Sequence, residues 1–238
     1  MESHAEESFH TACENGDLAR AKEIALTRDA TTREGRANTI RALRAAGTNG
    51  HLAVAQWLVT RYGLTDGYVR THHIPAALRG ACLNGHLEMA QWLAETYGTT
   101  EREANTSFNG IFRHACENGR IELAQWLARH FRLTKGDLSC EGPHDVLHVA
   151  CINGHTAIAT WLADEFGVGE QDIPVALLND ILLDACEAGH LDAAQWIIDH
   201  FNITAEDSPE ASSLKEIIAR YPQLTPPHGP LVKSAAKF

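Results

Sequence analysis

The stretch Leu147-His-Val-Ala-Cys-Ile-Asn-Gly-His155 decides the fold, because its central part recurs along the chain. The string Ala-Cys-x-Asn-Gly, or a close variant of it, occurs six times. Its final glycines are Gly16, Gly50, Gly85, Gly119, Gly154 and Gly189. Consecutive glycines are 34 or 35 residues apart, and a fixed period of this length is typical of repeat arrays.

Tryptophan repeats with the same period. Five tryptophans each lie seven residues after a repeat glycine, namely Trp57, Trp92, Trp126, Trp161 and Trp196. We expect this row to pack between repeats, because an indole ring buries a large area. The first repeat has Glu23 at this position, next to Lys22, which predicts a solvent-exposed outer face at the start of the array.

Each repeat has the pattern of two helices joined by a tight turn. In the first helix an apolar residue precedes Ala and Cys by three and four positions, as Phe112, Ala115 and Cys116 show, so all three share one helical stripe. The Asn-Gly pair then ends this helix, because glycine readily adopts the left-handed conformation found at helix C-termini. The second helix has a wide apolar face, formed in the third repeat by Leu87, Met89, Ala90, Trp92, Leu93 and Tyr97.

The connectors between repeats contain helix-start signals. A threonine precedes an acidic residue by three positions in three connectors, as in a capping box, so we expect a short extra helical turn there. The pairs are Thr100 with Glu103, Thr134 with Asp137, and Thr204 with Asp207. Pro75 and Pro174 suit the first turn of the long helix that follows them.

The composition argues against several classes of protein. With 44% apolar and 21% charged residues, the chain is typical of a folded protein. It has 20 Lys and Arg against 31 Asp and Glu, a net charge of −11, which argues against a nucleic-acid binder. No stretch approaches 18 consecutive apolar residues, so we expect no membrane helix. The acidic, polar N-terminus is unlike a signal peptide.

The repeat motifs resemble those of a known family. The stretch 147–155 is similar to the Leu-His-x-Ala-Ala-x-x-Gly-His motif of the ankyrin repeat. The second helix, as in Gly85-His-Leu-Glu-Met-Ala-Gln-Trp-Leu93, resembles that family's Gly-His-x-x-Val-Val-x-x-Leu. The chain departs from the family in lacking Thr-Pro before Leu-His, and in having Trp and Cys where Leu and the second Ala are usual. This Trp-rich form is similar to arrays of amoebae and their large DNA viruses.

We therefore predict an all-α fold, a solenoid of six ankyrin-like helix-turn-helix repeats with a C-terminal capping helix. The last repeat keeps an apolar second helix, which the amphipathic stretch 213–221 is suited to cover. Four prolines follow and forbid further helix. The expected organisation is an acidic N-terminal segment at 1–7, the repeat array at 8–207, the capping helix at 208–221 and a Pro-rich extended tail at 222–238.

The resemblance implies a non-enzymatic scaffold or adaptor that binds a protein partner on the concave face formed by first helices and connectors. It implies no catalytic residue and no cofactor, and the sequence contains no phosphate-binding loop, nucleophile elbow or HExxH motif. We expect a monomer that binds neither nucleic acid nor membrane. The alternative is a structural or assembly component that associates with copies of itself or with a larger particle, for example through residues 222–238.

One row on the first helices is the candidate binding surface. It lies one residue after the apolar anchor, and stacking would place Arg44, Arg79 and Arg113 in a ladder. One hypothesis is that this ladder binds an acidic peptide through charge-assisted bonds. From the sequence we favour the alternative, in which these arginines pair with acidic residues of this chain or with backbone carbonyls. The partner-binding candidates on this row and the adjacent one are Arg44, Arg79, Leu83, Arg113, Glu117, His148 and Ile152.

Cysteine and histidine also follow the repeat. Five of the six cysteines share one repeat position at about 10 Å from each other, too far for a disulfide. We expect buried free thiols and a reducing compartment, cytoplasmic or nuclear. A remote alternative is a zinc site, since Cys140, His144, His148 and Cys151 have suitable ligand chemistry. His51, His86, His155 and His190 follow a repeat glycine, and we expect them to begin the second helix and bond to backbone in the turn.

Overall fold

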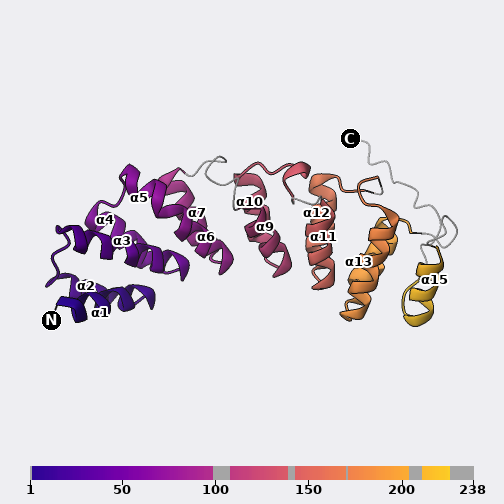
Figure 1. Ribbon diagram of the computed structural model, residues 1–238, viewed down its shortest axis with the longest axis horizontal. Coiled ribbons are helices and arrows are strands. Elements are labelled where there is room, and N and C mark those ends of the chain that lie inside the picture. The colour runs from indigo at the N-terminus through magenta and orange to yellow at the C-terminus, as the bar shows by residue number, and fades with distance from the viewer. Residues whose placement is uncertain (1, 99–107, 139–142, 170, 204–210, 226–238) are drawn as a thin grey trace. The chain divides into compact units, whose positions relative to one another are not determined.

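The computed structural model describes residues 2–98, 108–138, 143–169, 171–203 and 211–225. These residues form helices, turns and short irregular connections, and no strand occurs among them. The chain divides into two compact units (Figure 1). The N-terminal unit contains Met1–Ala115 and Glu122–Arg132, and the C-terminal unit contains Cys116–Ile121 and Leu133–Phe238. The predicted all-α class is confirmed.

The N-terminal unit is a series of paired helices. First helices α1, α3 and α6 pack against one another in order, and α2, α4 and α7 pack against their respective partners. The short helix α5 packs against α6. The helices are α1 (Glu2–Glu14), α2 (Leu18–Ala25), α3 (Arg33–Thr48), α4 (Leu52–Tyr62), α5 (Gly67–His72), α6 (Ile74–Leu83), α7 (Leu87–Tyr97), α9 (Phe108–Glu117) and α10 (Ile121–His130).

The C-terminal unit continues the same pattern. Helix α11 packs against α12 and α13, and α13 packs against α14 and α15. Its elements are η1 (Lys135–Asp137), α11 (Pro143–Ile152), α12 (Thr156–Phe166), α13 (Val175–Glu187), α14 (Leu191–His200) and α15 (Ala211–Arg220). Helix α15 packs on α13, the first helix of the last repeat.

The hydrophobic core consists of the same repeat positions in every helix pair. The apolar, Ala and Cys positions of the first helices are buried, as expected from the stripe of Phe112, Ala115 and Cys116. Buried second-helix residues face them, such as Met89 and Leu93 in α7. Burial of these apolar side chains is the main driving force for stacking one repeat on the next.

The turn between the two helices of a repeat depends on its glycine. All six repeat glycines have φ between 72° and 85°, a left-handed conformation that a residue with a side chain adopts only at a cost. The residue that follows is the N-cap of the second helix at His51, His86, His155 and His190, as predicted. None of these four side chains caps its own helix.

Instead, each of these histidines packs on the glycine of the preceding repeat. A Cβ added to the glycine would lie no more than 2.6 Å from the ring, in the pairs Gly16 with His51, Gly50 with His86, Gly119 with His155 and Gly154 with His190. His155 Nε2 also lies 3.0 Å from the Glu117 carbonyl oxygen. The expected bond to backbone therefore reaches the preceding repeat. We call this contact the His–Gly joint.

The connectors are helical where the structure describes them. The Thr134–Asp137 capping box is confirmed and encloses η1, whereas the pairs Thr100–Glu103 and Thr204–Asp207 lie outside the described residues. Helix α5 begins at Asp66, whose carboxylate accepts hydrogen bonds from the Tyr68 and Val69 amides. Its pKa is lowered, chiefly by the Val69 amide.

The two prolines before first helices differ in their placement. Pro75 lies in the first turn of α6, as expected. Pro174 directly precedes α13 as its N-cap, with ψ 141°, so it lies one residue outside the helix. Its extended backbone sets the entry of the chain into α13.

Polar contacts join neighbouring repeats within each unit. In the N-terminal unit the Tyr97 hydroxyl donates to the Leu64 carbonyl at 2.7 Å, and Arg36 forms an ion pair with Asp66. In the C-terminal unit Lys135 contacts Asp172 at 2.5 Å and donates to the Gly167 carbonyl at 2.9 Å. The connectors therefore add directional bonds to the apolar stacking.

The five repeated tryptophans are half-buried. Trp57 contacts Phe9 of the preceding repeat at 6.3 Å, which is the expected packing between repeats. Trp126 stacks on His130 at 5.0 Å and meets Phe131 edge-on at 6.0 Å, within its own repeat.

The two ends of the array are finished differently. At the start, Glu23 is exposed and pairs with Arg20 at 2.6 Å, as expected for a solvent-exposed outer face. At the end, Ile217 of α15 is buried and Arg220 contacts Glu187 of α13 at 3.1 Å. The non-helical residues 222–225 lie beside α14. The rest of the predicted tail lies outside the described residues.

The contact of the tail with α14 is specific. Leu224 is buried, and the Gln195 amide both donates to the Thr225 carbonyl at 3.0 Å and accepts from the Thr225 amide at 2.8 Å. This pair of bonds fixes the direction in which the chain leaves α15. The exposed apolar edge of the last repeat is thereby covered by a helix and a short extended segment.

The His–Gly joint predicts a difference between two glycine substitutions. Gly154→Ala should lower the free energy of unfolding by about 3 kcal/mol, because the methyl group meets the His190 ring in addition to the strained φ. Gly189→Ala has the same kind of φ but no atom within 4 Å, and should cost about 1–2 kcal/mol. Urea unfolding checks both variants, and equal losses would contradict a steric role for the histidine.

The half-buried tryptophans predict an intermediate effect on stability. Trp126→Ala should cost about 2 kcal/mol, below the ~3–5 kcal/mol of a fully buried ring, because this residue is already partly exposed to water. Leu127→Ala, at a fully buried neighbouring position, provides the comparison in the same urea unfolding experiment. A loss above about 4 kcal/mol for Trp126→Ala would show that the ring belongs to the core.

Candidate protein-binding surface

The candidate surface is built on the first helices of the N-terminal unit. Arg44 of α3 and Arg79 of α6 occupy the same position, six residues before their repeat glycine, and both are exposed. Neither forms an ion pair or a hydrogen bond with any residue that the structure describes. The expectation that they pair with acidic residues of this chain is therefore not met among the described residues.

The other members of the row are less exposed. Arg113, at the same position in α9, is half-buried, and His10 of α1 contacts Glu14 at 3.6 Å. In the C-terminal unit His148 of α11 contacts Asp184 of α13 at 2.8 Å. At this point of the row the basic side chain is thus paired with a carboxylate of the next repeat.

The adjacent row is partly buried. Leu83 and Ile152 are half-buried, as is Glu117. For Ile152 the reason is that α11 packs against α13, so part of the side chain is shielded by the neighbouring helix.

A cluster of rings lies on the connector before α6. Tyr68 of α5 is 59% exposed, although large apolar side chains are usually covered. It stacks on His72 with ring centroids 4.7 Å apart and meets His73, the N-cap of α6, at 5.3 Å. Burial lowers the pKa of His73, and the charges of His72 and Arg44 lower it further. We call this cluster the Tyr68 platform (Tyr68, His72 and His73), and it lies at the start of the helix that carries Arg79.

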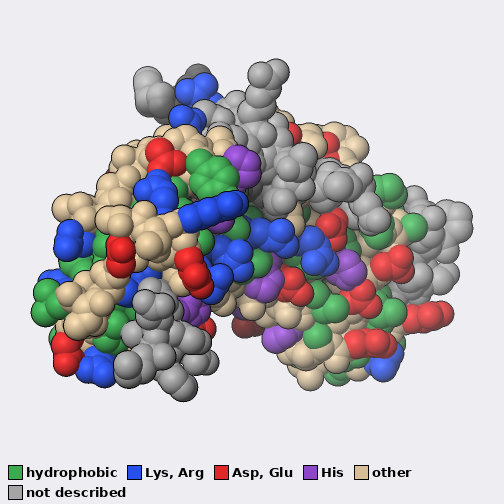
Figure 2. All heavy atoms as spheres, turned by 60° about the vertical axis from the view of Figure 1, so that its left-hand side comes forward, with side chains coloured by type: hydrophobic (Ala, Val, Ile, Leu, Met, Phe, Trp, Pro, Cys, Tyr) green, Lys and Arg blue, Asp and Glu red, His purple; other side chains and the backbone are tan. Residues whose placement is uncertain are grey.

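Charge is unevenly distributed along the chain. Residues 1–132 contain 15 Lys and Arg and 15 Asp and Glu, whereas residues 133–238 contain 5 and 16. The whole net charge of −11 therefore belongs to the second half of the sequence. Figure 2 shows Lys and Arg side chains gathered close together on the face in view. Residues 1–132 are therefore neutral in sum, whereas residues 133–238 repel an anionic ligand.

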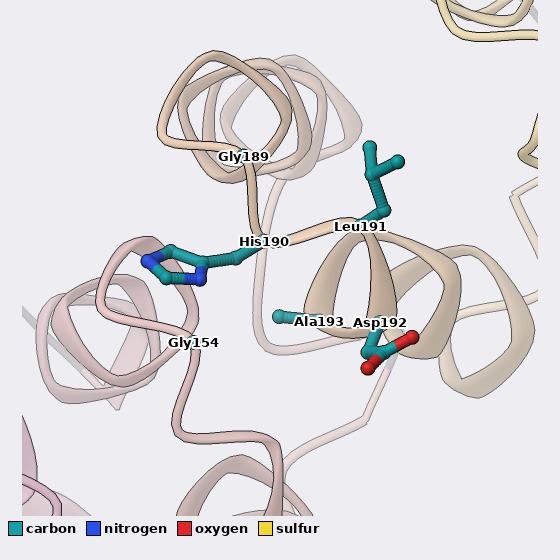
Figure 3. A pocket seen from close by; sticks show the side chains of 6 residues that line it. All are labelled: Gly154, Gly189, His190, Leu191, Asp192 and Ala193. Atoms are coloured by element: carbon teal, nitrogen blue, oxygen red, sulfur yellow. The ribbon is translucent and has the colours of Figure 1, made fainter.

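A shallow pocket of about 260 Å³ lies in the C-terminal unit, at the turn between α13 and α14. Figure 3 shows the His190 ring extending from this turn toward Gly154, which is the His–Gly joint described above. The other lining residues are Gly189, Leu191, Asp192 and Ala193. Backbone and short side chains dominate the wall, and Asp192 is the one carboxylate in it, so the pocket has no paired acid and base.

The repeated cysteines are free and buried, as predicted. Burial raises the pKa of the Cys82 and Cys151 thiols to about 12 and that of Cys186 to about 11. Burial also raises the pKa of Cys116. A thiol that is not ionised is a poor nucleophile and a poor metal ligand. These residues therefore serve as small apolar side chains of the core.

The alternative zinc site is only partly visible. Cys151 is fully buried in the repeat core and His148 bonds to Asp184. Cys140 and the side chain of His144 lie outside the described residues. Within the described part of the chain, no group of three His, Cys, Asp or Glu side chains is arranged to hold a metal ion.

Stacked helix pairs with a repeated turn define a helical repeat protein that presents side chains on its first helices. The sequence model of ankyrin repeats, which describes three copies, matches residues 78–172 and 112–207, together more than half of the chain. The chain belongs to the ankyrin repeat family. No curated protein matches it significantly.

Membership of this family defines the general function. Ankyrin repeats are protein–protein interaction modules, and the family is generally non-enzymatic. The matched residues lie within 78–207, so the total of six repeats stays a prediction. None of the described helices combines the length and apolar character that crossing a bilayer requires.

Sequence reasoning found the arginine row but missed the Tyr68 platform. The signal was present, since Asp66-Gly67-Tyr68 places an aromatic residue two positions after a helix N-cap in a connector. It also missed the pairing of His148 with Asp184, because the two residues are 36 positions apart and lie on different first helices.

Burial of the thiols predicts slow modification. At pH 8, a pKa of about 12 leaves roughly one thiol in ten thousand ionised, so Cys82 and Cys151 should resist an aromatic disulfide reagent for hours. Of the six cysteines, the five in the repeat position should react only after denaturation, when all six become available. Rapid reaction of two or more thiols in the folded protein would contradict this assignment.

Proposed function

We propose that this chain is a non-enzymatic adaptor that binds a protein partner through the basic first-helix face of its N-terminal unit. The observation that supports it is the exposure of Arg44 and Arg79 on consecutive repeats, without a partner among the described residues. Arginine is enriched in binding hot spots because its planar group forms several directed bonds. Membership of a family of interaction modules supports the same function.

Each unit has its own further candidate residues on its first helices. In the N-terminal unit, Leu83 and Arg113 are half-buried and provide partly shielded positions at the edge of the face. In the C-terminal unit, Glu117, His148 and Ile152 occupy the same repeat positions. A partner that uses this second group meets an acidic environment, so its contacting side chains there are expected to be basic or neutral.

The free thiols are informative about the cellular compartment in which the adaptor works. Five free, buried cysteines favour a reducing compartment, such as the cytoplasm or the nucleus. Neither a cofactor nor a metal ion enters the proposed function.

The proposal predicts a charge-dependent loss of binding. The double variant Arg44→Glu/Arg79→Glu should recover about one tenth or less of the partner that the wild type captures, because both cations are replaced by repelling charges. Affinity purification with quantitative mass spectrometry measures the recovered amount. The control is Arg33→Glu/Arg61→Glu, which makes the same change of charge at exposed positions elsewhere in the N-terminal unit. Identical sets of bound proteins for wild type and both variants would overturn the proposal.

A further inference from the structure

We propose that the partner segment is acidic and adopts a polyproline-II conformation, with carboxylates at positions i and i+3 on Arg44 and Arg79 and an apolar side chain on the Tyr68 platform. This inference rests on the proposed function and specifies the chemistry of its ligand. It is carried by three observations in the N-terminal unit: the register of the two arginines, their lack of described partners, and the exposed aromatic cluster beside one of them.

The spacing of the arginines sets the spacing of the carboxylates. Arg44 and Arg79 have the same register on α3 and α6, which pack directly against each other. Packed helix axes are about 8–10 Å apart, so the two guanidinium groups recur at about that interval. A ligand that runs along the row must present one anion per interval.

Polyproline-II geometry meets this requirement. It rises about 3.1 Å per residue with three residues per turn, so residues i and i+3 lie on one side about 9.3 Å apart. In a β-strand, side chains on one side are about 6.6 Å apart at i+2 and about 13 Å apart at i+4, and neither value matches. The row therefore favours the sequence pattern Glu-x-x-Glu in an extended segment without internal hydrogen bonds.

The chemistry of the ligand follows from charge. A guanidinium group binds a carboxylate through two parallel hydrogen bonds. In the free protein both arginine side chains are exposed to water, so neither charge is buried without a partner before the ligand binds. A nucleic acid fits less well. Binding of a phosphate backbone needs a larger basic face than two neighbouring arginines provide.

The Tyr68 platform provides the apolar part of the site. Its phenol ring is 59% exposed and is held by stacking on His72, so little conformational freedom is lost when a ligand covers it. His73 contacts Tyr68 and is the N-cap of α6, the helix that carries Arg79, which places the platform beside one carboxylate position. An aromatic or aliphatic side chain next to that carboxylate would cover the ring.

The C-terminal unit does not offer the same site. At the equivalent position of α11, His148 is already paired with Asp184, and α13 has Leu183 there. The neighbouring first-helix side chains of α13 include Asp180 and Glu187, which are exposed. An acidic segment is therefore directed to the N-terminal unit alone.

The test uses the full chain and fluorescence anisotropy with three labelled peptides of identical composition. Each contains one Phe directly before the first of two glutamates in a Ser/Gly background, and the glutamates are adjacent, two apart or three apart. We expect the three-apart peptide to bind at least fivefold more tightly than the other two. Proline between its glutamates should strengthen binding about two- to fivefold, because it preorganises the segment.

Matched variants locate the peptide. Arg44→Ala and Arg79→Ala should each weaken the three-apart peptide about three- to tenfold, whereas Arg61→Ala, a change of the same charge on α4, should leave it unchanged. Tyr68→Ala should weaken the Phe peptide about threefold or more and have no effect on a peptide with Ala in place of Phe.

Three results would overturn this inference. They are equal affinity for the three peptides, equal effects of Arg61→Ala and Arg44→Ala, and tighter binding of a single-stranded oligonucleotide than of any peptide. Each leaves the proposed function to its own test: if the Arg44→Glu/Arg79→Glu variant still loses its captured partner, the face binds a protein and only the assigned ligand pattern is wrong. If that loss is absent as well, both proposals fail.

Discussion

The array depends on one steric constraint, the absence of a side chain at the repeat glycine. The same glycine ends the first helix with a positive φ and leaves room for the histidine ring of the next repeat. Both requirements fall on one residue, so the turn within a repeat and the contact between repeats cannot vary independently. This coupling explains why the Gly-His pair recurs at a nearly constant interval, while the connectors differ in length and sequence.

With the interior set by the repeat, variation between repeats is confined to the surface of the first helices and connectors. Core positions are filled by the same small set of side chains in each helix pair. In the row that begins with His10, the N-terminal unit has the exposed residues Arg44 and Arg79. The C-terminal unit has His148 in this row, and its side chain is paired with Asp184. The two units therefore present different charges on a common scaffold, which is how a repeat protein acquires a distinct binding surface on each part of its length.

The sequence predicts the periodic part of this structure well. The helix pairs, the glycine turns, the buried cysteines and the Thr134–Asp137 capping box follow from local patterns that a single chain displays. The half exposure of Trp126, the pairing of His148 with Asp184 and the partner of His155 do not follow. These features depend on how a side chain of one helix meets a helix about 35 residues away, and periodicity within one helix does not record that direction.

The joint has a consequence for how such a chain lengthens. Its two halves are a glycine at the end of one repeat and a histidine at the start of the next second helix, so every internal boundary of this type is interchangeable. Gly189 keeps the left-handed backbone with no atom within 4 Å of its missing side chain. Tandem duplication of one segment between such glycines would create a boundary identical to those already present. A duplicated module would therefore form the same turn and the same His–Gly joint, while the polar contacts between repeats, such as that of Arg36 with Asp66, differ from one boundary to the next.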